Sequence, residues 1–136
     1  MKIIIVDDNN EFRSTLRFFL EQKLNHTVIA DVASGEDFLA LNSTLICDAD
    51  VIIMDIVMNQ LNGIEATKRI TWVHKNIKIL EVTMHIEKIF LEQVIEAGFK
   101  GCVFKSEVFH TLEKALQEVK AGRLFINEHL LVDKQG

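Results

Sequence analysis

The chain has 136 residues, a length that suits one domain with a single hydrophobic core. Apolar residues make up 49% and charged residues 26%, as in ordinary globular proteins, while a net charge of −5 argues against nucleic-acid binding by this chain alone. No apolar run approaches the roughly 20 residues of a membrane span, and the two cysteines match no disulfide or metal spacing, so we expect a cytoplasmic protein.

Apolar runs alternate with amphipathic segments along the chain. The run at 51–54 is apolar without alternation and stops at Asp55, which is typical of a strand buried on both faces of a parallel sheet. Apolar residues three and four apart indicate the helices. In chain order we expect strand 2–6, helix 10–24, strand 27–30, helix 35–44, strand 50–55, helix 64–74, strand 77–82, helix 86–97, strand 101–104 and helix 107–121.

Five strands that alternate with five helices predict an α/β fold with helices on both faces of a parallel sheet and right-handed crossovers. At this size we expect the flavodoxin-like (CheY-like) five-stranded sheet in the order 2-1-3-4-5. Residues 1–122 should form this domain. Residues 123–136 contain only a small apolar group and are expected to be a C-terminal tail or the start of a linker.

Polar groups follow four of the predicted strands. They are Asp7 and Asp8 after the first strand, Asp55 after the third, Thr83 at the end of the fourth and Lys105 after the fifth. In the predicted order these four strands are consecutive neighbours. Ligands of open α/β sheets bind at the carboxyl ends of the strands, so we expect all five side chains to face one crevice.

Three carboxylates in one crevice repel one another unless a cation lies among them. Mg²⁺ is the expected cation, because it binds one or two carboxylates together with water and phosphate oxygens. Asp8 and Asp55 are predicted as direct ligands and the backbone carbonyl of Val57 as a third. Asp7 is predicted to act mainly through water.

With the metal bound, Asp55 is expected to attack a phosphorus atom and form an acyl phosphate. Lys105 would offset charge on the phosphoryl oxygens in the transition state. The Thr83 hydroxyl can donate a hydrogen bond to one of these oxygens. The sequence therefore predicts a phosphoacceptor site.

Two longer motifs carry a family resemblance. Residues 54–66 (MDIVMNQLNGIEA) and 97–105 (AGFKGCVFK) resemble the central and fifth-strand motifs of the receiver domain of two-component response regulators. The acidic pair, the phosphoacceptor Asp55, the switch hydroxyl of Thr83 and the lysine Lys105 also match, over roughly residues 2–121. Residues 62–66 and the segment after Gly122 are similar to receivers of LuxR-type transcription regulators.

The resemblance implies a role in signal transduction rather than turnover of a separate substrate. A sensor histidine kinase would donate the phosphoryl group, and the chain would catalyse only its own phosphorylation and dephosphorylation. The full-length protein would carry a C-terminal DNA-binding output domain, and homodimerisation is a further expectation. No membrane contact is implied.

The sequence departs from the family at a few positions. Cys102 stands where receivers usually have an aromatic residue that reports the position of the switch hydroxyl, and we hypothesise that Phe104 on the same strand face substitutes for it. Met84 replaces the usual small residue after Thr83 and is expected to narrow access to the phosphoacceptor. Glu81 interrupts an apolar strand, which predicts either a position near solvent or a lysine partner.

Two other functions compete with the switch. A pseudo-receiver would keep the fold as a protein-binding module and signal without phosphate, which the unusual Cys102 and Met84 favour. A metal-dependent phosphohydrolase would need a second catalytic aspartate two residues after Asp55. Val57 occupies that position.

Overall fold

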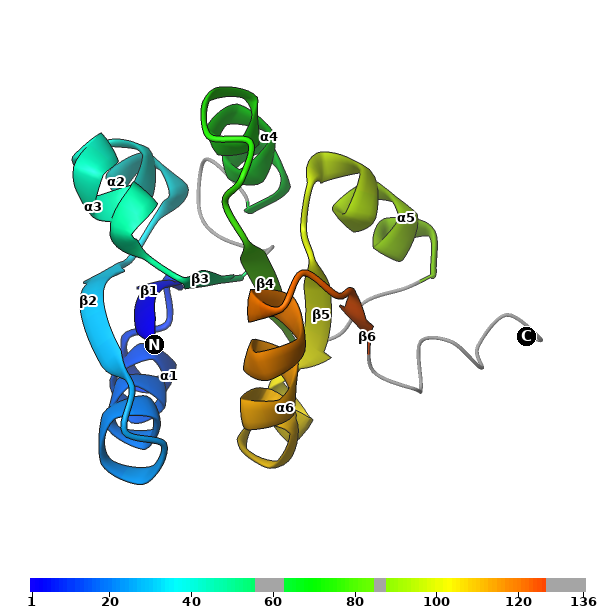
Figure 1. Ribbon diagram of the computed structural model, residues 1–136. Helices are drawn as coiled ribbons and strands as arrows, with labels where there is room; N and C mark the ends of the chain where they lie inside the picture. The colour runs from blue at the N-terminus through cyan, green and yellow to red at the C-terminus, as the bar shows by residue number, and fades with distance from the viewer. Residues whose placement is uncertain (56–62, 85–87, 127–136) are drawn as a thin grey trace.

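A computed structural model describes residues 1–55, 63–84 and 88–126. Its strands form one parallel sheet in the order β2-β1-β3-β4-β5-β6, so the predicted α/β class and the order 2-1-3-4-5 are confirmed (Figure 1). The strands are β1 (Lys2–Val6), β2 (Thr27–Val32), β3 (Val51–Met54), β4 (Ile79–Thr83), β5 (Gly101–Phe104) and β6 (Phe125–Ile126).

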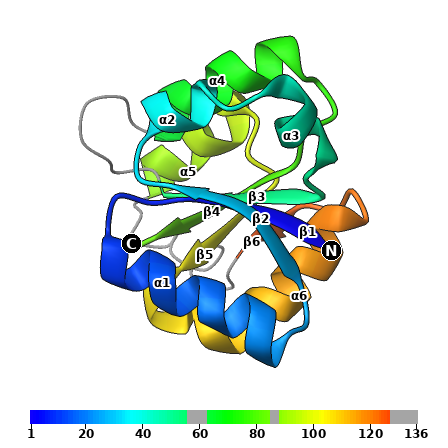
Figure 2. The ribbon, with the colours of Figure 1, turned by 90° about the vertical axis from the view of Figure 1, so that its left-hand side faces the viewer.

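The helices cover both faces of the sheet, as predicted. Figure 2 shows α1 and α6 on one face and α2, α3, α4 and α5 on the other. Their bounds are α1 (Asn10–Phe18), α2 (Gly35–Leu39), α3 (Ser43–Asp48), α4 (Gly63–Val73), α5 (Lys88–Ala97) and α6 (Val108–Lys120). Among the residues described, no helix combines the length and the apolar character that crossing a membrane requires.

Alternate residues of the central strands belong to two separate cores. Side chains such as Ile4, Ile52 and Met54 pack beneath α2 to α5, whereas Ile5, Ile53 and Leu80 pack beneath α1 and α6. All four residues of β3 are buried, because the pleat sends successive side chains to opposite faces and helices cover both. This double burial explains why the sequence of the strand shows no polar alternation.

Beyond shifts at the ends of elements, three features differ from the sequence prediction. The segment expected as one helix, 35–44, contains two short helices, since the Asn42 side chain accepts the backbone N–H of Thr44 and starts α3 anew. Helix α1 continues as a π-helical turn over Phe19–Lys23. The sixth strand, β6, was not expected, because two residues are too few to show the alternation of apolar and polar side chains that indicates a strand.

Gly98 ends α5 with φ at +115°, and a Cβ built there would lie 2.9 Å from Thr71 Cγ2. Gly122 also has a positive φ, +88°, but a Cβ there would meet nothing within 4 Å. We expect Gly98→Ala to lower the free energy of unfolding by about 3 kcal/mol, since backbone strain and a steric clash add. The matched control, Gly122→Ala, should cost about 1 kcal/mol from strain alone. Urea denaturation of both variants measures the difference, and equal losses would contradict the clash.

Candidate active site

The ends of β1 and β3 lie side by side and carry two buried aspartates. Val6 pairs in register with Met54, so Asp7 and Asp55 follow at the same level of the sheet. The backbone N–H of Asp55 donates to the Val6 carbonyl at 3.0 Å, and that of Asp7 donates to the Val32 carbonyl at 3.1 Å. Asp7 is 2% exposed and Asp55 6%. Backbone hydrogen bonds to neighbouring strands thus fix both residues at the carboxyl-end edge of the sheet.

Asp8 joins these two residues to complete an acidic cluster. One carboxylate oxygen from each of Asp7, Asp8 and Asp55 lies within 4.8 Å of the others. Carboxylate oxygens are the donor set that Mg²⁺ prefers, so the residues present fit the predicted ion. Asp8 is the most accessible of the three. The third predicted ligand, the carbonyl of Val57, lies outside the described residues.

Lys105 places its ammonium between two of the carboxylates. Its Nζ lies 2.8 Å from Asp7 Oδ2 and 3.3 Å from Asp55 Oδ2, and its side chain is 9% exposed. Burial by itself would lower the pKa of Lys105. The hydrogen bond to Asp7 and the charges of Asp55 and Asp7 outweigh burial and raise the pKa above its ordinary value, so the lysine is charged. One ammonium leaves the three carboxylates with a net negative charge, which favours a further cation.

Thr83 is the last residue of β4 and lies at the same edge of the sheet. It pairs in register with Phe104, the residue before Lys105, and it is 2% exposed. The structure therefore brings together Asp7, Asp8, Asp55 and Lys105 by direct proximity, and Thr83 by strand register. The hydroxyl of Thr83 can donate a hydrogen bond to an anion at this edge.

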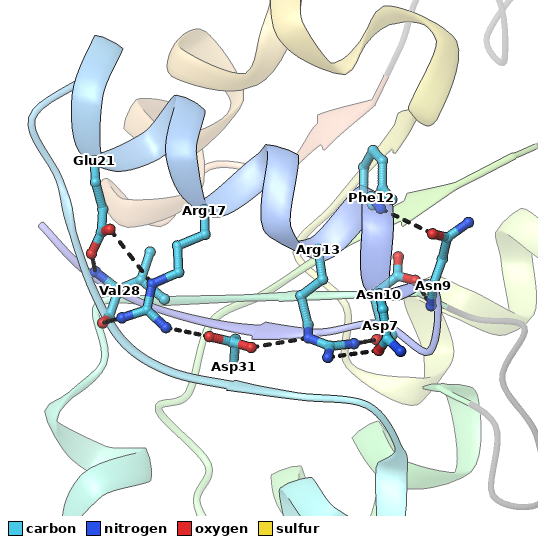
Figure 3. Close-up of polar contacts among 9 residues, drawn as sticks. All are labelled: Asp7, Asn9, Asn10, Phe12, Arg13, Arg17, Glu21, Val28 and Asp31. Atoms are coloured by element: carbon cyan, nitrogen blue, oxygen red, sulfur yellow. Dashed lines mark hydrogen bonds and ion pairs between the residues drawn. The ribbon is translucent and has the colours of Figure 1, made fainter.

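The loop between β1 and α1 is fixed by a chain of hydrogen bonds (Figure 3). The backbone N–H of Asn9 donates to Asp7 Oδ1 at 2.8 Å, and Asn9 Oδ1 accepts the backbone N–H of Phe12 at 2.9 Å. Asn9 thereby caps α1. Arg13 Nη1 donates to the Asp7 carbonyl at 2.5 Å. The loop that carries the acidic pair is thus held to the first turn of α1 by the hydrogen bonds of Asn9 and Arg13.

Arg13 also ties this loop to the end of β2. Its Nε donates to Asp31 Oδ1 at 3.0 Å and its Nη2 to Asn10 Oδ1 at 2.8 Å. Figure 3 shows Arg17 on the other side of Asp31 from Arg13. Arg17 also forms an ion pair with Asp31, but its side chain does not reach the Asp7 loop. Sequence reasoning missed Arg13, because a lone arginine on a helix is most often a surface charge. The only available signal was its position five residues after Asp8.

Arg13→Met is expected to lower the Mg²⁺ affinity of the cluster about tenfold, because loss of the hydrogen bond to the Asp7 carbonyl loosens the loop that carries Asp7 and Asp8. Arg17→Met is the matched control. It removes a bond to the same Asp31 but none to the Asp7 loop, so its Mg²⁺ affinity should stay within about twofold of wild type. Titration of Mg²⁺ by calorimetry checks both values. An equal loss in the two variants would show that the Asp31 pairing, and not the loop contact, matters.

The residues that depart from the family pattern have defined places. Cys102 is buried, and burial together with the charge of the nearby Glu81 raises the pKa of its thiol, so it is an uncharged core residue. Phe104 packs against the same core as Cys102, as expected for one strand face. Glu81 is fully buried in the sheet, so the prediction of a position near solvent is wrong. Met84 is 75% exposed.

Comparison with known proteins agrees with this geometry. The family model of the response regulator receiver domain matches residues 3–117. The transcriptional regulatory protein DegU of Brevibacillus brevis is 29% identical over 127 residues, which are 93% of this chain and 53% of that protein. The response regulator GacA of Pseudomonas aeruginosa is 28% identical over 130 residues, 96% of this chain and 60% of that protein. The chain thus spans little more than half the length of these relatives.

Solved structures show the same architecture. A two-component response regulator of the LuxR family from Aurantimonas sp. SI85-9A1 is 30% identical, with a TM-score of 0.85 over 96% of this chain and 91% of that one. The isolated receiver domain of RcsB from Salmonella enterica serovar Typhimurium, solved with the phosphomimetic BeF3⁻, is 27% identical, with a TM-score of 0.83 over 96% of each chain. A structure of two RcsB dimers on two parallel DNAs is 27% identical, with a TM-score of 0.84 over 96% of this chain and 66% of that one.

Proposed function

We infer the function from one premise: this chain belongs to the response regulator receiver domain family of two-component systems. Its relatives include transcriptional regulators and receivers of the LuxR type. We propose that the chain is a phosphorylation-dependent switch in which Asp55 takes a phosphoryl group from a sensor histidine kinase. The observation that carries the proposal is the buried Asp55 carboxylate, with the Lys105 ammonium 3.3 Å away and two further aspartates beside it.

The proposed transfer is a displacement at phosphorus. An Asp55 carboxylate oxygen forms a P–O bond while the P–N bond of the donor phosphohistidine breaks, and the departing imidazole keeps the bonding pair and takes a proton from water. The Lys105 ammonium offsets charge on the phosphoryl oxygens. Thr83 donates its hydroxyl to one of them.

Mg²⁺ is the proposed cofactor of this site. Asp8, Asp55 and the carbonyl of Val57 would hold it, and Asp7 would act through water. When bound, the ion supplies positive charge for the phosphoryl oxygens and relieves the repulsion among the three carboxylates. The fit rests on the donor set of the acidic cluster, three carboxylates that reach within 4.8 Å of one another.

The output of the switch is a change of surface. Phosphorylation replaces the Asp55–Lys105 contact, and we propose that Thr83 and Lys105 move with their loops and shift the surface of α5, β5 and α6 between two states. In a cytoplasmic full-length protein this surface would control a C-terminal DNA-binding domain, and two copies would pair, as RcsB does in the structure of two RcsB dimers on DNA. The chain would turn over no substrate other than its own phosphoryl group.

Incubation with acetyl phosphate and Mg²⁺, followed by intact mass measurement, tests the proposal. The wild type should gain one phosphoryl group, and Asp55→Asn should gain none. Asp48→Asn is the matched control, because it removes an exposed aspartate that pairs with Lys2 at the opposite end of β1 from Asp7, so it should leave phosphorylation unchanged. Sustained hydrolysis of a phosphate ester would indicate the phosphohydrolase instead.

The pseudo-receiver is the second candidate function. The observation in its favour is the buried Cys102 in place of an aromatic residue, since a small core side chain cannot report the position of Thr83 to the surface. A wild-type protein that gains no mass at high acetyl phosphate concentration, although it is folded, would support this function and refute the switch.

A further inference from the structure

The Lys105 ammonium contacts an aromatic ring in addition to two carboxylates. Lys105 Nζ lies 4.4 Å from the centroid of the Phe12 ring, well inside the roughly 6 Å within which a cation is attracted to a ring face. The same ammonium contacts Asp7 and Asp55. The side chain of Lys105 is 9% exposed, so water competes weakly and the attraction is stronger than at a surface site. Two carboxylates and one ring therefore surround the ammonium.

The position of Phe12 is fixed by its neighbours. Its backbone N–H donates to Asn9 Oδ1, so the residue is part of the capped first turn of α1. Its ring lies 6.4 Å from that of Phe109 on α6, and Phe109 makes an edge-to-face contact with Phe19 at 5.0 Å. The ring is thus linked through Asn9 to the loop that carries Asp7, and it is supported from α6.

The contacts of Lys105 differ in how they respond to phosphorylation, and this step rests on the proposed function. Asp55 is the reacting group, so its contact with the ammonium must be exchanged for one to the phosphoryl oxygens. Asp7 and Phe12 are not consumed. They are the groups that can keep a long, flexible lysine within reach of phosphorus throughout the reaction.

We propose that Phe12 is a positioning residue whose ring face holds the Lys105 ammonium over the site and thereby raises the rate at which Asp55 gains a phosphoryl group. The attraction comes from the negative ring face and not from ring volume. Withdrawing electrons from the ring, without changing its size appreciably, must then weaken the hold. A residue that only fills space would respond to size alone.

Site-specific incorporation of mono-, di-, tri- and pentafluorophenylalanine at position 12 tests the proposal. The initial rate of phosphorylation by acetyl phosphate with Mg²⁺ should fall stepwise with each fluorine, about three- to tenfold over the series. The same series at Phe18, an exposed residue of α1, is the matched control and should give a flat response. Thermal melts verify that each variant is folded. The wild type should also show nuclear Overhauser contacts between the Phe12 ring protons and the Lys105 ε-methylene protons.

A flat response at position 12, or absence of the ring–methylene contacts in the folded wild type, would overturn the proposal. A parallel fall in rate in both fluorinated series would do so too, because it would trace the effect to general perturbation of α1. If the wild type gains no phosphoryl group, the proposed function fails and the rate effect fails with it. The Overhauser contacts then decide separately whether the ring lies against the lysine.

Discussion

Lys105→Met is expected to slow phosphorylation of Asp55 by acetyl phosphate about 100-fold. The ammonium lies 3.3 Å from Asp55 Oδ2 in a buried site, and removing one preorganised donor to a developing charge typically costs at least this factor. Methionine keeps most of the length and apolar volume of the lysine stem, so contact with Phe12 persists while the charge is lost. The initial rate, followed by intact mass with time, is the measurement.

The control for this prediction is another lysine that forms an ion pair. Lys2 pairs with Asp48 at 3.0 Å, but both side chains are about half exposed, so Lys2→Met should leave the phosphorylation rate unchanged. A Lys105→Met rate within threefold of wild type would contradict the assigned role. The lysine would then be a structural partner of the carboxylates only.

Asp8→Asn is expected to stabilise the protein in the absence of divalent cations. Three carboxylates reach within 4.8 Å of one another, and a pair at ~5 Å in an effective dielectric of about 20 repels by about 3 kcal/mol. The ion pairs of Lys105 compensate the charges of Asp7 and Asp55 but not that of Asp8. Because Asp8 is partly exposed, solvent screens it, and we expect the free energy of unfolding to rise by about 1–2 kcal/mol in chelator.

The same substitution should abolish the stabilisation that Mg²⁺ gives the wild type, since Asp8 is a predicted direct ligand. Urea denaturation with chelator and with 10 mM Mg²⁺, on the order of a saturating concentration, measures both effects. Asp48→Asn, at an exposed surface pair, should change neither value by more than about 0.5 kcal/mol. Equal Mg²⁺ stabilisation of Asp8→Asn and wild type would refute the ligand assignment.

Much of the fold could be predicted from the sequence, because burial of strands and helices determines the pattern of apolar residues. The uninterrupted apolar run at 51–54 has no polar alternation because helices cover both faces of β3, and together with the alternation of strands and helices it predicted a parallel sheet. Asp55 and Lys105 could be placed at one edge because parallel strands share the direction of their carboxyl ends. The acidic cluster and its contact with Lys105 follow from topology.

The parts that could not be predicted depend on contacts between distant segments. Arg13 meets Asp31 across 18 residues, and neither residue differs in sequence from an ordinary surface charge. Phe12 has helical spacing with other apolar residues, so it reads as core, although its ring lies against Lys105. The break at Asn42 depends on one side-chain hydrogen bond that competes with a continuous helix.

Identification of the modified atom tests the central claim most directly. The wild type, phosphorylated with acetyl phosphate and Mg²⁺, is treated with borohydride, which reduces an aspartyl phosphate to homoserine, and its peptides are then sequenced by mass spectrometry. The account predicts homoserine at position 55 and unmodified aspartate at positions 7 and 8. Homoserine at another position, or a phosphoryl group that survives borohydride on a histidine, serine or threonine, would contradict it.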